Sequence, residues 1–100
     1  MTPEVEIVRI PVDAARAPEL IQALEQARLG YLAAPACQEL RLLLNQARDE
    51  VAAIVTWSSA HSHAEAMKTP QAASFFKAVS IFASARPDVR SYLPTGVEGA

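Results

Sequence analysis

The stretch from residue 51 to residue 70 constrains the fold of this chain most, because a strand pattern leads directly into a helix there. Val, Ile and Thr fill its first part, which ends at Trp57, and residues of these types favour strands. Ser59 then supplies an N-cap for a helix over residues 60–68. The pair Thr69-Pro70 repeats the signal, since a capping residue is followed by a proline in the first turn. The sequence therefore predicts a strand, a helix, a sharp break and a second helix.

The elements on either side follow from the periodicity of the apolar residues. Residues 4–12 and 37–45 carry the alternating pattern of strands. Between them, Pro18 fits the first turn of a helix that Pro35 closes. The predicted order is strand 4–12, helix 18–35, strand 37–45, strand 50–57, helices 60–68 and 70–86, and strand 88–93.

This order is typical of the split βαβ, ferredoxin-like fold, an α+β architecture with an antiparallel four-stranded sheet and helices on one face. The second face of such a sheet stays uncovered. We expect Val8, Leu43 and Ala52 on that face, where another sheet would cover them best. A homodimer joined through the sheet face is the resulting hypothesis.

Length and composition place limits on the type of protein. The chain of 100 residues is predicted to be one domain, with a core over about residues 4–93 and a loose tail over 94–100. Its net charge of −2, with scattered basic residues, offers no positive field for nucleic acid. Residues 1–12 are too charged for a signal peptide, and no apolar run suits a membrane span. We expect a cytoplasmic protein that binds neither nucleic acid nor membrane.

Three stretches carry a resemblance to a known family: the opening strand VEIVRIPV, the tripeptide PAC at 35–37, and VTWSSAHSHAEAMKTPQAASFF from residue 55. Together they resemble the antibiotic biosynthesis monooxygenase domain family, whose members form dimeric α/β barrels. In that family a strand ends in Trp, an acidic or serine pair follows, and a helix leads through a Ser/Thr-Pro step to a phenylalanine-rich helix. The resemblance covers roughly residues 5–93.

The resemblance implies one of two known activities. Some members are cofactor-independent monooxygenases that use O₂ on electron-rich phenols or quinols in a pocket between sheet and helices, and others degrade haem. The Asn, Trp and His of the haem degraders fall on Val8, Ala66 and about Phe76 here, and none of these can do that chemistry. Haem degradation is therefore disfavoured, and we expect no cofactor and no metal.

Trp57, His61 and His63 are the candidate catalytic residues. Trp57 is either a core aromatic residue or a pocket wall that orients a planar substrate. The two histidines titrate near neutral pH, so either could act as a general base towards a phenol or could simply be solvated on a helix. Two positions apart on a helix, they point to nearly opposite sides and cannot share a metal ion.

Six further residues are candidates for substrate binding. Tyr31, Phe75 and Phe76 are expected to line an apolar cavity together with Trp57. Arg9, Arg41 and Tyr92 interrupt strand patterns; each could stabilise an oxyanion in a pocket or make hydrogen bonds at a sheet edge or a dimer interface.

Two functions remain open from the sequence. The first is a monooxygenase acting on a quinol or polycyclic phenol without a cofactor. The alternative is a non-catalytic accessory domain that binds a small aromatic molecule, because one fold hosts many functions. An enclosed cavity with convergent polar groups would favour catalysis, whereas a filled core would argue against it.

Overall fold

The computed structural model describes residues 2–33 and 36–95, and its elements follow the predicted order. Several bounds differ from the predicted ones by one or two residues. The larger differences are a short 3₁₀ helix in part of the expected loop before the first α-helix, and a last helix that ends four residues earlier than predicted. The tail predicted to be loose lies mostly outside the described residues. The elements are β1 (Glu4–Pro11), η1 (Ala14–Arg16), α1 (Ala17–Ala33), β2 (Cys37–Leu44), β3 (Glu50–Trp57), α2 (Ala60–Ala66), α3 (Pro70–Phe82) and β4 (Asp88–Tyr92).

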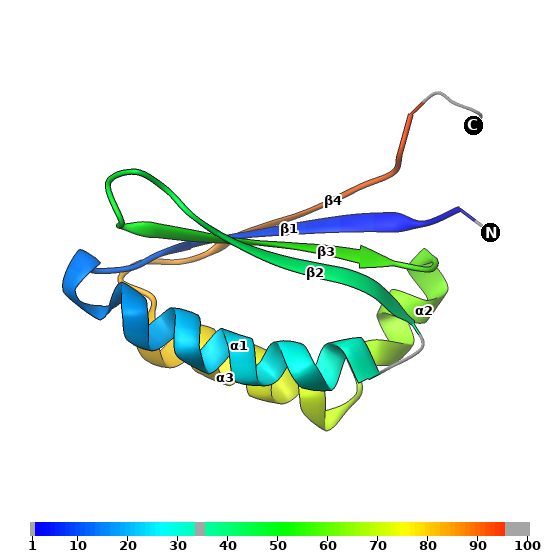
Figure 1. The fold of residues 1–100 in the computed structure, drawn as a ribbon. Helices are drawn as coiled ribbons and strands as arrows, with labels where there is room; N and C mark the ends of the chain where they lie inside the picture. The colour runs from blue at the N-terminus through cyan, green and yellow to red at the C-terminus, as the bar shows by residue number, and fades with distance from the viewer. Residues whose placement is uncertain (1, 34–35, 96–100) are drawn as a thin grey trace.

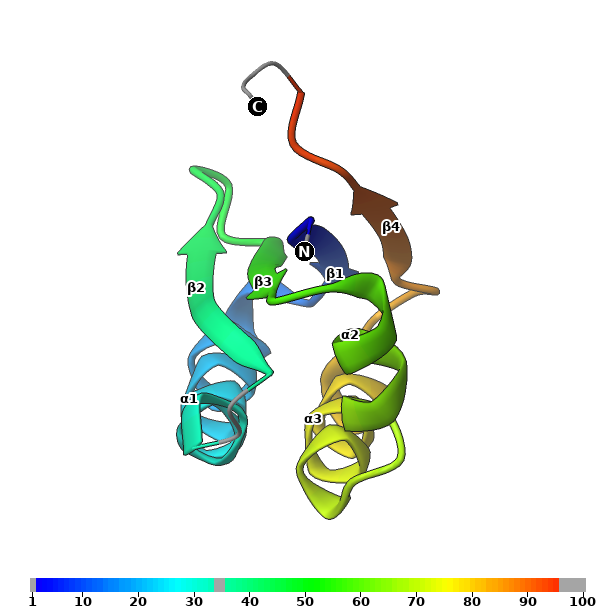
Figure 2. The same cartoon turned by 90° about the vertical axis from the view of Figure 1, so that its right-hand side faces the viewer.

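The four strands form one antiparallel sheet in the order β2-β3-β1-β4. Helices α1 and α3 lie side by side on one face of this sheet, and α2 lies at the end where β3 stops (Figures 1 and 2). The α+β, ferredoxin-like fold is thus confirmed. Within the described residues, no helix combines the length and apolar character needed to cross a membrane.

Alternation along the central strands divides the sheet into a helix-facing side and an open side. On β1, Glu6, Val8 and Ile10 are buried towards the helices. The expectation that Val8 lies on the open face is therefore wrong: β1 carries apolar residues at both parities, so its pattern does not identify the buried side. Leu43 and Ala52 pair with each other and do lie on the open face, as predicted.

Side-chain caps produce the break between α2 and α3. The Ser59 hydroxyl accepts a hydrogen bond from the Ser62 N–H at 3.1 Å. The Thr69 hydroxyl accepts one from the Ala72 N–H at 3.4 Å, ahead of Pro70 in the first turn of α3. Each cap gives an acceptor to one N–H group in the first turn of its helix, which favours a new helix start at that point.

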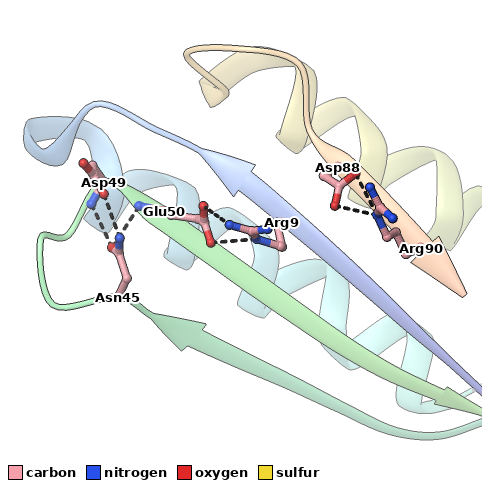
Figure 3. A network of polar contacts seen from close by, with 6 residues as sticks. All are labelled: Arg9, Asn45, Asp49, Glu50, Asp88 and Arg90. Atoms are coloured by element: carbon pink, nitrogen blue, oxygen red, sulfur yellow. Dashed lines mark hydrogen bonds and ion pairs between the residues drawn. The ribbon is translucent and has the colours of Figure 1, made fainter. Parts of the chain in front are cut away.

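The turn between β2 and β3 depends on one side chain. The Asn45 carbonyl oxygen accepts hydrogen bonds from the N–H groups of Asp49 and Glu50, both at 3.0 Å, and its amide donates to the Asp49 carboxylate at 2.7 Å (Figure 3). Within the turn, Arg48 adopts a left-handed conformation with φ of 62°. Asn45 thus replaces several backbone contacts that a regular turn would make.

Replacing Asn45 by Ala should destabilise the protein by about 1–3 kcal/mol, because two backbone N–H groups lose their acceptor. Urea unfolding monitored by circular dichroism measures the loss. Gln46→Ala, in the same exposed turn, is the matched control and should change the free energy of unfolding little. Equal effects of the two variants would contradict a special role for Asn45.

Candidate functional site

A polar cluster lies inside the end of the sheet beside α2. Trp57, the last residue of β3, is fully buried and pairs with Glu4 at the start of β1. Its indole N–H donates to the Glu6 carboxylate at 3.4 Å. The His63 ring, from α2, is nearly parallel to the indole, with centroids 4.8 Å apart and an angle of 6° between the planes.

His63 joins two carboxylates of β1. Its Nδ1 contacts Glu4 Oε1, and its Nε2 lies 3.5 Å from Glu6 Oε1. The side chains of His63, Glu4 and Glu6 are 15%, 14% and 6% exposed, respectively. Two acidic groups and one imidazole therefore share a site with little access to water. Such a cluster can hold and release a proton, because the charges of its members depend on one another.

Burial sets the electrostatics of this cluster. It raises the pKa of Glu6 above the usual 4.5, because removal from water penalises the charged form. The positive charge of His63 and the hydrogen bond from Trp57 lower the same pKa, and Glu4 raises it. The net result is a raised pKa. Glu6 therefore keeps a proton to a higher pH than an ordinary glutamate.

The aromatic residues expected to form a cavity fill the core instead. The Tyr31 and Trp57 rings meet edge to face at 5.5 Å, and those of Tyr31 and Phe75 lie 5.3 Å apart. All three residues are almost completely buried. Burial also raises the pKa values of Tyr31 and Cys37, so both stay neutral near neutral pH. The predicted cavity among these residues is wrong, and a filled core argues against catalysis around Trp57.

Open space exists instead between α3 and the edge strand β4. A cleft of about 680 Å³ lies there. Val89 forms part of one wall and is 49% exposed; it pairs with Val8, so it faces the helix side of the sheet. The lining combines apolar and charged residues: Phe76, Val79, Ser80, Arg86, Pro87, Asp88 and Val89.

The charges at this cleft are unbalanced. Both Asp88 carboxylate oxygens accept from the Arg90 guanidinium, at 3.3 and 3.2 Å. Arg86 has no ion-pair partner among the residues that the structure describes. A cleft with partly apolar walls, and with an arginine that has no ion-pair partner among the described residues, suits a ligand that is planar and carries, or develops, negative charge.

The other predicted site residues are dispersed. His61 is exposed and lines a shallow groove with Ser58 and Glu65, so the two histidines do point to different sides of α2. Arg9, Arg41 and Tyr92 lie on the open face of the sheet; Figure 3 shows Arg9 in front of the strands with the helices behind. Of the nine candidates only Phe76 lines the cleft. Their proposed roles stay predictions.

Sequence reasoning missed Glu4, Glu6 and Arg86. Glu6 had a detectable signal, because it shares the parity of Val8 and Ile10 and is thus a carboxylate in a buried register. Arg86 had none, because its position before Pro87 indicated only the end of a helix.

Comparisons with known proteins find solved structures of similar fold but no match by sequence. No protein-family model matches the chain, and no curated protein matches it. Solved structures do. Rv0793 from Mycobacterium tuberculosis superposes with a TM-score of 0.85 at 16% identity, covering 96% of this chain and 98% of that one.

Two further structures bear names that indicate a function. SnoaB from Streptomyces nogalater, a cofactor-independent oxygenase, has a TM-score of 0.84 at 13% identity, with 97% of each chain covered. A protein from Bordetella bronchiseptica, provisionally named an antibiotic biosynthesis monooxygenase, has a TM-score of 0.82 at 20% identity, covering 95% of this chain and 99% of that one. The resemblance to this family is confirmed at the level of the fold.

The raised pKa of Glu6 predicts how stability changes with pH. Its stabilising contribution is complete below the ordinary value of 4.5 and is lost as the pH rises through the folded-state pKa. Relative to the wild type, the stability of Glu6→Gln should therefore rise between acidic and neutral pH, because the variant has no such contribution to lose. Urea unfolding across this range measures the difference. Glu39→Gln, at an exposed position on β2, should show no such trend, and a flat difference for Glu6→Gln would contradict the assignment.

Proposed function

We propose that this protein is a cofactor-independent monooxygenase that oxidises a quinol or polycyclic phenol with O₂ in the cleft between α3 and β4. The volume of the cleft, about 680 Å³, lies within the range of about 300–1,000 Å³ typical of small-molecule sites. Its walls include Phe76 and Val89, which suit a flat aromatic ring. This cleft is the observation that carries the proposal.

The chemistry needs little from the protein beyond binding and orientation. With an anthrone-like phenol, one oxygen atom of O₂ becomes a quinone carbonyl and the other leaves as water with the two ring hydrogens. The substrate supplies the electrons. Arg86, which lines the cleft, would stabilise the phenolate form, which is the more electron-rich one. The apolar walls would hold and orient the aromatic ring.

The named neighbours support the same kind of activity. SnoaB, described as a cofactor-independent oxygenase, shares this fold over nearly the whole chain. Because fold alone does not establish function, the likeness adds weight without identifying a substrate. A cytoplasmic location, expected from the sequence, belongs to the same proposal.

A binding domain without catalysis is the second candidate. The filled core around Tyr31, Trp57 and Phe75 favours it, because the interior offers no enclosed chamber there. Neither histidine lines the α3–β4 cleft. Such a protein would bind the same planar aromatic molecules and leave them unchanged.

We further propose that the open face of the sheet joins two copies in a homodimer. Its centre carries partly buried apolar residues such as Ile7 and Ile54, on neighbouring strands. Ion pairs between Arg9 and Glu50 and between Asp88 and Arg90 lie on the strands of the same sheet (Figure 3). An apolar centre together with charged residues is a common composition of a protein interface.

Purified protein should consume O₂ with anthrone-like phenols or quinols and release the matching quinone. Ser80→Trp should lower this rate at least about tenfold, because its indole would occupy the cleft where substrate binds. Ser74→Trp is the matched control, since Ser74 is exposed on the same helix but lies in a different groove. An oxygen electrode and quinone absorbance follow the reaction.

Two outcomes would redirect the proposal. Uptake of O₂ that Ser80→Trp leaves unchanged would place the reaction outside this cleft. No uptake, with ligand-dependent quenching of Trp57 fluorescence, would favour the binding domain. Trp57 is a clean reporter because the sequence contains one tryptophan.

The dimer should be present at micromolar concentration in sedimentation velocity. Ile54→Glu should dissociate it, because a charge would enter an apolar interface without a partner. Ile81→Glu provides the control, since Ile81 is 54% exposed on α3, in the helix layer. A monomeric wild type, or equal effects of the two variants, would refute a sheet-to-sheet interface.

A further inference from the structure

We propose that Glu4, Glu6 and His63 form a proton-dependent latch, which holds α2 against the end of the sheet and releases it as the cluster loses a proton. The latch joins the first residues of β1 to a helix almost sixty positions later in the chain. It also covers Trp57, because the His63 ring stacks on the indole. The inference does not depend on the proposed catalytic activity.

Helix α2 has few other attachments. It contains seven residues, of which Ala66 alone is buried. Helices of this length are unstable in isolation, because forming the first turn costs more than one or two further turns recover. The Ser59 cap and the hydrogen bond that the Thr69 hydroxyl donates to the Ala66 carbonyl hold its two ends but do not bind it to β1. His63 is the residue of α2 whose side chain reaches β1 through polar contacts.

The two ring nitrogens of His63 are the reason that the latch needs a proton. A neutral imidazole has one N–H and one nitrogen with a lone pair. In this cluster each nitrogen of His63 faces a carboxylate oxygen, of Glu4 on one side and Glu6 on the other. With a neutral ring, one of the two contacts sets a lone pair against an anionic oxygen and becomes repulsive. Both contacts are attractive only when the cluster holds an additional proton.

The surrounding groups do not replace that proton. Tyr31 and Cys37, from α1 and β2, stay neutral because burial raises their pKa values. On the outer side of α2, the Glu65 carboxylate is paired with Lys68 at 3.1 Å, and His61 is exposed. Among the described residues, His63 is the one positive group acting on Glu6.

The direction of the pH effect follows from linkage. The closed latch binds one proton more than the open one, so closure weakens as the pH rises. The raised pKa of Glu6 acts in the same direction, because the stability that protonated Glu6 contributes to the closed state is also lost as the pH rises. For one proton, the ratio of open to closed molecules grows about tenfold per pH unit over the active range.

The latch acts on the structure rather than on a cleft ligand. None of its three residues lines the α3–β4 cleft. Release of His63 would instead uncover one face of Trp57 and the carboxylate of Glu6. Opening would thereby create access to a core region that is filled in the closed state.

Amide hydrogen exchange between about pH 5 and pH 8, a range that brackets the ordinary pKa of imidazole, tests the latch. After correction for the intrinsic exchange rate, protection of the His63 and Met67 amides should fall with rising pH, by up to about tenfold per unit. The Ala83 amide at the end of α3 is the internal reference and should not follow this trend.

Three variants complete the test, each checked for an intact fold by its amide spectrum. In His63→Gln, protection of α2 should be low and independent of pH, because the imidazole that joins the two carboxylates is gone. In Glu6→Gln, the pH dependence should be shallower, because one of the two charges that favour the protonated ring is removed. His61→Gln, with the same change two positions away on the exposed side, should behave like the wild type.

Two results would overturn the latch. One is α2 protection in the wild type that does not change with pH. The other is a pH dependence of equal slope in His63→Gln. Acrylamide quenching of Trp57 provides a second readout that does not require resolved amides: it should rise with pH in the wild type and in His61→Gln, and be high throughout in His63→Gln.

Discussion

The antiparallel pairing of β1 with β3 is the constraint on which the rest of this structure depends. The register runs from Glu4 opposite Trp57 to Pro11 opposite Glu50. Because side chains alternate between the faces of a sheet, a slip of one residue would move every buried side chain of β1 to the open face. The same register brings Glu6 and the Trp57 indole to one face, within hydrogen-bond distance. The register of β1 with β3 therefore determines both the packing of the core and the position of the polar cluster.

A carboxylate in this register conflicts locally with the apolar core around it. The fold compensates with an indole N–H from β3 and an imidazole from α2, both directed at the same oxygen of Glu6. Buried acidic groups persist where partners offset the loss of water. A buried carboxylate departs from the usual apolar composition of a core. Where partners stabilise such a departure, the position often has a function. The compensation by His63 also ties a helix of marginal stability to the sheet.

The sequence predicts the fold well because its signals are local. Strand alternation, the Ser59 cap and the Thr69-Pro70 step each involve residues close in the chain, and each appears in the structure. The site is less predictable, because it depends on how distant elements pack. No local pattern states that Tyr31 fills the space between Trp57 and Phe75, or that β4 leaves a cleft beside α3. The parity of Glu6 was the one local clue to the cluster.

The cleft and the polar cluster lie along the same pair of strands and are joined by aromatic rings. Val89 of the cleft pairs with Val8, and the next helix-facing pair along β1 and β4 contains Glu6. Phe76 lines the cleft, and its ring centroid lies 5.3 Å from that of Phe75. Ring contacts then continue from Phe75 through Tyr31 to Trp57, and from Trp57 to His63. Protein interiors are close-packed, so a ring cannot move without displacing its neighbours. The rings of these residues therefore form one continuous set of contacts between the cleft and the polar cluster.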